Sequence, residues 1–236
     1  MSAHCAFGPR LCETQMLRLD ACPYHPRMEV REERPADART VHDVLLRAFG
    51  DHGPMAAGLA GTLRHDVAAG RGLALVAEDD GRVVGQVMFS RSLLDAPRRL
   101  VEVQVLSPLA VEPGRQGRGI GSALVRRGLE ILDGRAVPAV FLEGDPAYYS
   151  RFGFLPGGPL GFRKPSLRIP DPAFQAVRLT AHEPWMTGTL VYSEAFWAHD
   201  AVGLREPGPG PRPGTPASDQ PPAPRPQTLS GGWRPR

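Results

Sequence analysis

The stretch VEVQVLSPLAVEPGRQGRGIGSALV, residues Val101 to Val125, decides the fold of this chain. A strand-like apolar run breaks at Pro113-Gly114 into a turn rich in glycine and arginine, and the turn opens directly into a helix. Glycine lets the backbone approach a ligand without a Cβ clash, and the first amides of a helix lack partners within it. With Arg115 and Arg118 at its rim, the turn predicts a polyphosphate site.

Two other phosphate-binding motifs do not fit this turn. The chain contains no G-x-x-x-x-G-K-[ST] sequence, so a nucleotide-hydrolysing P-loop is not supported. A dinucleotide fold requires G-x-G-x-x-G after its first strand, whereas Gly117, Gly119 and Gly121 are spaced G-x-G-x-G after the fourth. Taken alone, a glycine-rich turn is equally typical of a tight connection without a ligand.

The pattern around the turn alternates between strands and helices, which predicts an α/β (α+β) domain. A short strand is expected at Met28, followed by a turn at Pro35. Helices are expected at 40–49, 54–69, 119–133 and 146–152, and further strands at 73–78, 83–90, 101–111, 137–142, 176–179 and 188–192.

Composition divides the chain of 236 residues into three parts. Residues 1–27 show no sustained periodicity and are predicted to be a disordered extension. Residues 206–236 hold ten Pro and five Gly, which predicts a disordered tail. The domain is therefore expected at 28–205. Its net charge is 0, because the extension carries +1 and the tail +2 of the overall +3. A neutral domain argues against nucleic-acid binding.

Several classes of protein are excluded or disfavoured by what the sequence lacks. No apolar run is long enough to cross a membrane, and the N-terminus does not resemble a secretory signal, so a cytoplasmic location is expected. Cys5, Cys12 and Cys22 fit neither a disulfide framework nor a zinc site, and no metal is expected. The sequence leaves open whether the protein forms a homodimer.

Two motifs in sequence order resemble those of the GNAT superfamily of N-acetyltransferases. Gln116–Gly121, QGRGIG, matches its Q/R-x-x-G-x-G/A signature, and Tyr148–Phe154, YYSRFGF, resembles its Y-x-x-x-G-F segment. LEGDPAYYSRFGF is similar to the YhbS-like group, and the resemblance covers roughly residues 28–204. It implies the GNAT acyl-CoA N-acyltransferase fold, a mixed, mostly antiparallel twisted sheet of six to seven strands flanked by about four helices.

The resemblance also implies a cofactor site for acetyl-CoA as co-substrate. The backbone of Leu109, Ala110 and Val111 would pair with the pantetheine arm, and an N–H near Leu109 would polarise the thioester carbonyl. Tyr149 would protonate the departing thiolate, which leaves Tyr148 as a core residue. The pyrophosphate would be held by Gln116, Gly117, Arg118, Gly119, Ile120, Gly121 and Ser122.

The acceptor and the general base are less well defined by the sequence. An attacking amine must be neutral, and Glu102 and Glu143 are the candidate bases by placement, although each is also typical of a solvated or ion-paired carboxylate. The resemblance also implies an Asn that contacts the cofactor several residues before the Tyr, but this chain has Asp145-Pro146 there, so that contact is left open. The leading interpretation is acetyl transfer from acetyl-CoA to a primary amine of a small molecule or protein, by direct attack in a ternary complex. The alternatives are a catalytically silent module that binds CoA or acyl-CoA and, less favoured, a thiol acyl carrier using Cys22.

Overall fold

The computed structural model describes residues 28–205. The expectations for residues 1–27 and 206–236, including the three cysteines and the proline-rich tail, lie outside the described residues. Contacts divide the chain into Met1–Gly203 and Leu204–Arg236, and the description below concerns the described part of the first unit. The domain bounds 28–205 stay a prediction.

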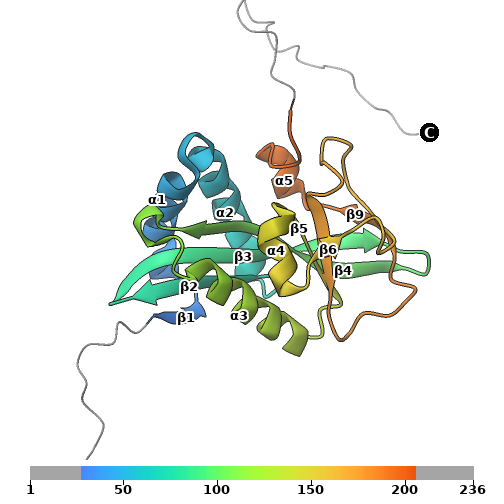
Figure 1. Cartoon of the computed structure of the whole chain (residues 1–236), viewed down its shortest axis with the longest axis horizontal. Helices are drawn as coiled ribbons and strands as arrows, with labels where there is room; N and C mark the ends of the chain where they lie inside the picture. Colours follow the sequence, from blue (N-terminus) through green and yellow to red (C-terminus); the bar gives the residue numbers. More distant parts are fainter. Residues whose placement is uncertain (1–27, 206–236) are drawn as a thin grey trace, which may run out of the picture. The chain divides into compact units, whose positions relative to one another are not determined.

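One mixed sheet of nine strands organises the described residues (Figure 1). Its main path runs β1-β2-β3-β4-β5-β8-β6, and β9 pairs with both β3 and β7. Strand pairs are antiparallel except β4 with β5 and β7 with β9. The strands are β1 Glu29–Glu32, β2 Leu73–Asp79, β3 Arg82–Asp95, β4 Leu100–Val111, β5 Ala139–Glu143, β6 Leu155–Pro156, β7 Phe162–Arg163, β8 Phe174–Arg178 and β9 Gly188–Val191.

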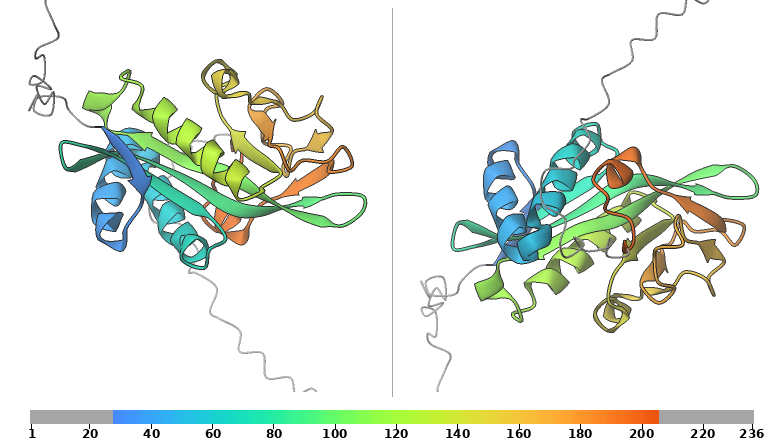
Figure 2. Two further views of the ribbon diagram at one scale, coloured as in Figure 1. Left: turned by 90° about the horizontal axis from the view of Figure 1, so that it is seen from below. Right: turned by 90° about the horizontal axis from the view of Figure 1, so that it is seen from above.

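Helices cover both faces of this sheet (Figure 2). One apolar core lies under α1, α2 and α5, and a second lies under α3. The short helix α4 follows β5. The helices are α1 Ala38–Phe49, α2 Gly53–Ala68, α3 Ile120–Gly134, α4 Pro146–Tyr149 and α5 Glu194–Ala198. Single 3-10 turns occur at Pro35–Asp37, Gly50–His52, Pro113–Arg115 and Ser150–Phe152. Within residues 28–205, no helix is both long and apolar enough to cross a membrane.

The predicted fold class is confirmed, with differences in the number and length of strands. The six to seven strands expected are too few, because β6 and β7 have two residues each and leave no periodic signal. β3 extends to Asp95, beyond the expected end at Ser90, because its last residues pair with the start of β4 on one side and with β9 from the end of the domain on the other.

The helix α3 forms because its apolar residues recur on one face. Ile120, Leu124, Val125, Gly128 and Leu132 are buried, and they pack α3 onto the sheet. α1 follows the same rule on the opposite face, where Val41, Val44 and Leu45 are buried as their spacing predicts. The two helices thus enclose the middle of β3 and β4 from either side.

Replacing Gly128 by Ala should destabilise the fold by about 1–3 kcal/mol. A Cβ at this position would clash with Cε2 of Phe89, whose ring is fully buried on β3 and has little room to move. Gly134 on the same helix has nothing within 4 Å of its Cβ position, so Gly134→Ala should stabilise by up to about 1 kcal/mol. Urea unfolding of both variants measures the difference, and equal stability of the two would contradict the tight α3–β3 packing.

Candidate active site

The sheet opens between β4 and β5. The two strands are parallel and are paired only at Gln104 with Val140 and at Val105 with Phe141. Beyond Val105, β4 continues to Val111 along β3 while β5 ends at Glu143. The last residues of β4 therefore border an opening on the side that faces away from β3.

The backbone of Leu109 and Val111 faces this opening. In a strand, successive residues direct their N–H and C=O groups to opposite sides. Glu112 donates its N–H to the carbonyl oxygen of Val84 on β3. The N–H and C=O groups of Ala110, two residues earlier, therefore also face β3, and those of Leu109 and Val111 face the opening. This edge of β4 can accept an extended ligand as an added strand.

The turn after β4 ends at the exposed amides of α3. Gly117 and Gly119 have positive φ angles of 74° and 83°, which an L side chain rarely adopts, and Gly119 is the residue that caps the N-terminus of α3. No side chain at this cap accepts a hydrogen bond from the first turn. The amides of Ile120, Gly121 and Ser122 are thus available to an anion, beside the positive end of the helix dipole.

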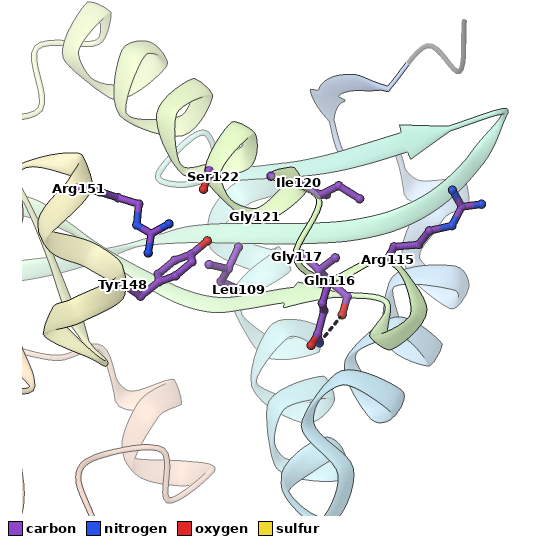
Figure 3. Close-up of a pocket in the computed structure, with 11 residues that line it drawn as sticks. Leu109, Arg115, Gln116, Gly117, Ile120, Gly121, Ser122, Tyr148 and Arg151 are labelled. Carbon is purple, nitrogen blue, oxygen red and sulfur yellow. Dashed lines mark hydrogen bonds between the residues drawn. The ribbon is translucent and has the colours of Figure 1, made fainter. Parts of the chain in front are cut away.

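A cavity of about 550 Å³ joins the β4 edge to this helix N-terminus. Figure 3 shows side chains from the turn, α3 and α4 arranged around it. It is lined by Leu109, Val111, Arg115, Gln116, Gly117, Gly119, Ile120, Gly121, Ser122, Tyr148 and Arg151. Eight of the ten predicted cofactor residues are among these.

The two remaining predicted cofactor residues lie outside the cavity lining, and Arg115 is engaged by another residue. Ala110 is buried in the core on the α1 side, and Arg118 is exposed and is not part of the lining. Arg115 points away from the other side chains in Figure 3 and is ion-paired with Asp79. Gln116 donates from Nε2 to the carbonyl oxygen of Val111 at 3.1 Å, so it ties the turn to the end of β4.

The two neighbouring tyrosines occupy different surroundings. Tyr148, expected in the core, lines the cavity, and its hydroxyl oxygen lies 2.6 Å from where a Cβ on Gly121 would be. Tyr149 packs against the α3-side core and edge-on to Phe154. Its ring also touches the position of a Cβ on Gly144, directly after β5. Burial raises the pKa of Tyr149, which keeps its hydroxyl protonated.

Glu143, one of the two candidate bases, ends β5 at the opening. It lies two residues after Phe141, so both side chains belong to the α1 and α2 face of the sheet. Oε1 accepts a hydrogen bond from the Tyr192 hydroxyl at 2.8 Å, and Oε2 accepts one from the Gly203 amide at 2.9 Å. Burial raises the pKa of Glu143, and these two hydrogen bonds act in the opposite direction.

Glu102, the other candidate, lies far from the opening. It stands seven residues before Leu109 on β4, about 23 Å away along the strand. Its side chain is 65% exposed and is ion-paired with Arg91 on β3. The ion pair with Arg91 across the strands accounts for the presence of this carboxylate. Its distance from the opening argues against a role for Glu102 as the base.

The chain matches the sequence pattern of a known domain family over residues 29–157, the acetyltransferase (GNAT) domain. This chain belongs to the GNAT acetyltransferase family. It is 34% identical over 159 residues to the uncharacterized N-acetyltransferase YjhQ of Escherichia coli K12, covering 66% of this chain and 86% of YjhQ. It is 35% identical to the uncharacterized N-acetyltransferase YhbS of the same strain, covering 72% of this chain and 98% of YhbS.

Solved structures of similar sequence have the same fold as this GNAT acetyltransferase. The crystal structure of YhbS from Escherichia coli in complex with CoA has a TM-score of 0.65 at 35% identity, and covers 73% of this chain and 93% of that one. A GNAT family acetyltransferase from Brucella melitensis in complex with acetyl-CoA has a TM-score of 0.58 at 33% identity, covering 73% and 99% of the two chains.

Two features of the site of this GNAT acetyltransferase were not predicted from the sequence. Arg151 lines the cavity, with its guanidinium carbon 4.8 Å from the ring centroid of Tyr148. Asp145 accepts a hydrogen bond from the amide of Ala147 at 2.9 Å and so caps α4. The D-P sequence indicates such a cap, because Pro is favoured in the first turn of a helix. Among residues 28–205, no three His, Cys, Asp or Glu side chains are grouped to hold a metal ion.

Proposed function

We propose that this GNAT acetyltransferase transfers the acetyl group of acetyl-CoA to a primary amine by direct attack within a ternary complex. The observation that carries the proposal is the continuous cavity from the open edge of β4 to the uncapped amides of α3. The edge suits the amide groups of pantetheine, and the helix N-terminus suits a pyrophosphate. Two relatives of the same fold are in complex with CoA and with acetyl-CoA. The proposal includes a cytoplasmic location, which is inferred from the sequence alone.

Three residues near the opening, Leu109, Tyr149 and Glu143, have a role in the proposed reaction. The amine nitrogen attacks the thioester carbonyl carbon, and the N–H of Leu109 stabilises the negative charge that develops on the carbonyl oxygen. Collapse of the tetrahedral intermediate breaks the carbon–sulfur bond, and Tyr149 protonates the departing thiolate. Glu143 accepts the proton that the amine loses, directly or through one water. Glu102 has no part in this scheme.

Arg151 adds a positive charge to the phosphate end of the cavity. Its guanidinium lies over the ring of Tyr148, and the hydroxyl of Tyr148 lies beside Gly121 in the first turn of α3. We assign Arg151 to the phosphate groups of CoA, because guanidinium groups recognise phosphate oxygens with two hydrogen bonds. Arg115 is less suited to this role since it is paired with Asp79.

The proposal is tested by release of the free CoA thiol when a panel of primary amines is added to the full chain with acetyl-CoA. Amine-dependent release should fall at least about 100-fold in Glu143→Gln, because the substitution keeps the shape of the side chain and removes the base. Release that is unchanged by Glu143→Gln would show that another group takes the proton. Thiol release that no amine increases would contradict amine acetylation itself.

The pH dependence of the same assay should move when Tyr192 is replaced by Phe. The Tyr192 hydroxyl, the Gly203 amide and the charge of Arg168 lower the pKa of Glu143, against the larger effect of burial that raises it. Removing the hydroxyl should therefore raise this pKa further, so the acidic limb of the rate profile shifts to higher pH. Comparing both proteins with one amine cancels the ionisation of the amine. A limb that stays in place, or moves to lower pH, would contradict Glu143 as the base.

A further inference from the structure

Arg126 is an exposed arginine of α3 that has no acidic partner among residues 28–205. Its guanidinium carbon lies 5.4 Å from the ring centroid of Phe152, in the 3-10 turn that follows α4. The next residue, Arg127, is also exposed, but it is ion-paired with Glu130 on the same helix at 3.2 Å. Two neighbouring arginines of one helix therefore differ in their surroundings, and the contact of Arg126 points toward α4.

The side of α3 that carries Arg126 is the side that borders the cavity. Ser122 lines the cavity, and residues four apart lie one above the other on the same face of a helix. Arg126 is thus one turn, about 6 Å along the helix axis, beyond Ser122. Because its side chain is exposed, a ligand that leaves the cavity along α3 can reach it.

Arg151 brings a second guanidinium to this end of the cavity. It belongs to the cavity lining, and Figure 3 shows it on the same side of the cavity as Ser122. Its guanidinium carbon is 4.8 Å from the ring centroid of Tyr148, and the rings of Tyr148 and Phe152 are in edge contact with centroids 5.6 Å apart. Arg126 and Arg151 therefore lie over two touching rings, and they come from different elements.

Neither guanidinium is neutralised by a carboxylate of the described part of the chain. Arg151 donates only to the carbonyl oxygen of Ala147, at 3.5 Å. By contrast, Arg115, the other arginine of the cavity lining, is ion-paired with Asp79. Like charges repel, so two arginines over touching rings with no carboxylate beside them favour an anion at this place.

We propose that Arg126, together with Arg151, binds the 3′-phosphate of CoA, so that the enzyme distinguishes CoA from dephospho-CoA. The amides of α3 hold the pyrophosphate in the proposed function, which leaves this third phosphate group without a partner. It is on the ribose that carries the pyrophosphate, one sugar ring away, as Arg126 is one helical turn away from Ser122. A phosphate monoester carries nearly two negative charges at neutral pH, which suits two guanidinium groups. This inference rests on the proposed function, because it needs the pyrophosphate to be bound at α3.

The test compares CoA with dephospho-CoA, which differ only in the 3′-phosphate. Calorimetric titration of the full chain should show CoA binding about tenfold more tightly, as a charged hydrogen bond supplies. Arg126→Gln should remove most of this preference by weakening CoA binding, and should leave the affinity for dephospho-CoA unchanged. Arg126→Lys keeps the charge without the fork of donors and should retain part of the preference. Arg127→Gln, the matched control, should keep all of it.

The outcomes separate this inference from the function on which it rests. A parent protein that binds neither ligand would overturn the proposed function, and this inference with it. A parent protein that binds both ligands equally would overturn only the recognition of the 3′-phosphate. The role of Arg126 would also be wrong if Arg126→Gln kept the preference, or if it weakened the binding of both ligands equally. An equal loss of preference in Arg127→Gln would contradict the role as well, because it would show a general effect of positive charge on α3.

Discussion

Replacing Tyr149 by Phe should lower kcat by about 100-fold or more, with little change in the affinity for acetyl-CoA. Tyr149 matches the tyrosine of the Y-x-x-x-G-F segment, and its ring lies against the end of β5 where the sheet opens. Its hydroxyl carries the proton that the thiolate needs, and burial, which raises its pKa, makes it a weaker acid that gives up the proton only as negative charge develops on sulfur. Loss of the hydroxyl should affect the chemical step and leave the ring packing unchanged.

Tyr148→Phe is the matched control for this experiment. Tyr148 lines the cavity beside Gly121, and its hydroxyl faces the phosphate end of the site. We expect this variant to weaken acetyl-CoA binding by a few-fold, as the loss of one hydrogen bond would, and to keep kcat within a few-fold of the parent. Steady-state kinetics and titration calorimetry on both variants assign the two roles. A large kcat loss in Tyr148→Phe, with Tyr149→Phe nearly normal, would reverse the assignment.

Replacing Gly119 by Glu should weaken acetyl-CoA binding by at least about 100-fold. The backbone at Gly119 has a φ angle of 83°, which costs an L residue roughly 1–2 kcal/mol. The new carboxylate would also stand at the N-terminus of α3, where the pyrophosphate charge is expected. Nothing lies within 4 Å of the Cβ position, so a steric clash does not contribute.

Two further variants separate the contributions of charge and backbone strain. Gly114→Glu adds the same charge to the same turn, but Gly114 is outside the cavity lining and its Cβ position is also open. It should bind acetyl-CoA nearly as well as the parent. Gly119→Ala carries the strain without the charge and should fall between the two. Titration calorimetry on the full chain measures all three, and near-normal binding by Gly119→Glu would place the pyrophosphate elsewhere.

Much of the cavity lining could be predicted from the sequence, because it is local. Gly117 to Ser122 are consecutive, and a strand, a glycine turn and a helix place their amides together wherever they occur. The roles of the side chains could not be predicted in this way. From the sequence, Arg115 and Arg118 in the turn both look free to bind a phosphate. Only the position of Asp79 on β2 shows that Arg115 is ion-paired within the protein.

The sequence also could not distinguish between the two candidate bases. Glu102 and Glu143 both lie on strands next to the turn in sequence order, and nothing in their neighbours distinguishes them. The structure separates them, because β4 is long and β5 leaves it after Val105. Glu102 thus pairs with Arg91 at the closed end, whereas Glu143 stands at the opening, bound by Tyr192 and Gly203 from the end of the domain.

The sequence by itself determined the family, the alternation of strands and helices, and the turn that presents the amides of α3. These features depend on the conformations of neighbouring residues, which composition and spacing control. Only the tertiary structure decided where the sheet opens, which tyrosine lines the cavity, and which glutamate stands at the opening. These features arise from pairing and packing between segments far apart in the chain, and the spacing of neighbouring residues does not specify which distant segments meet.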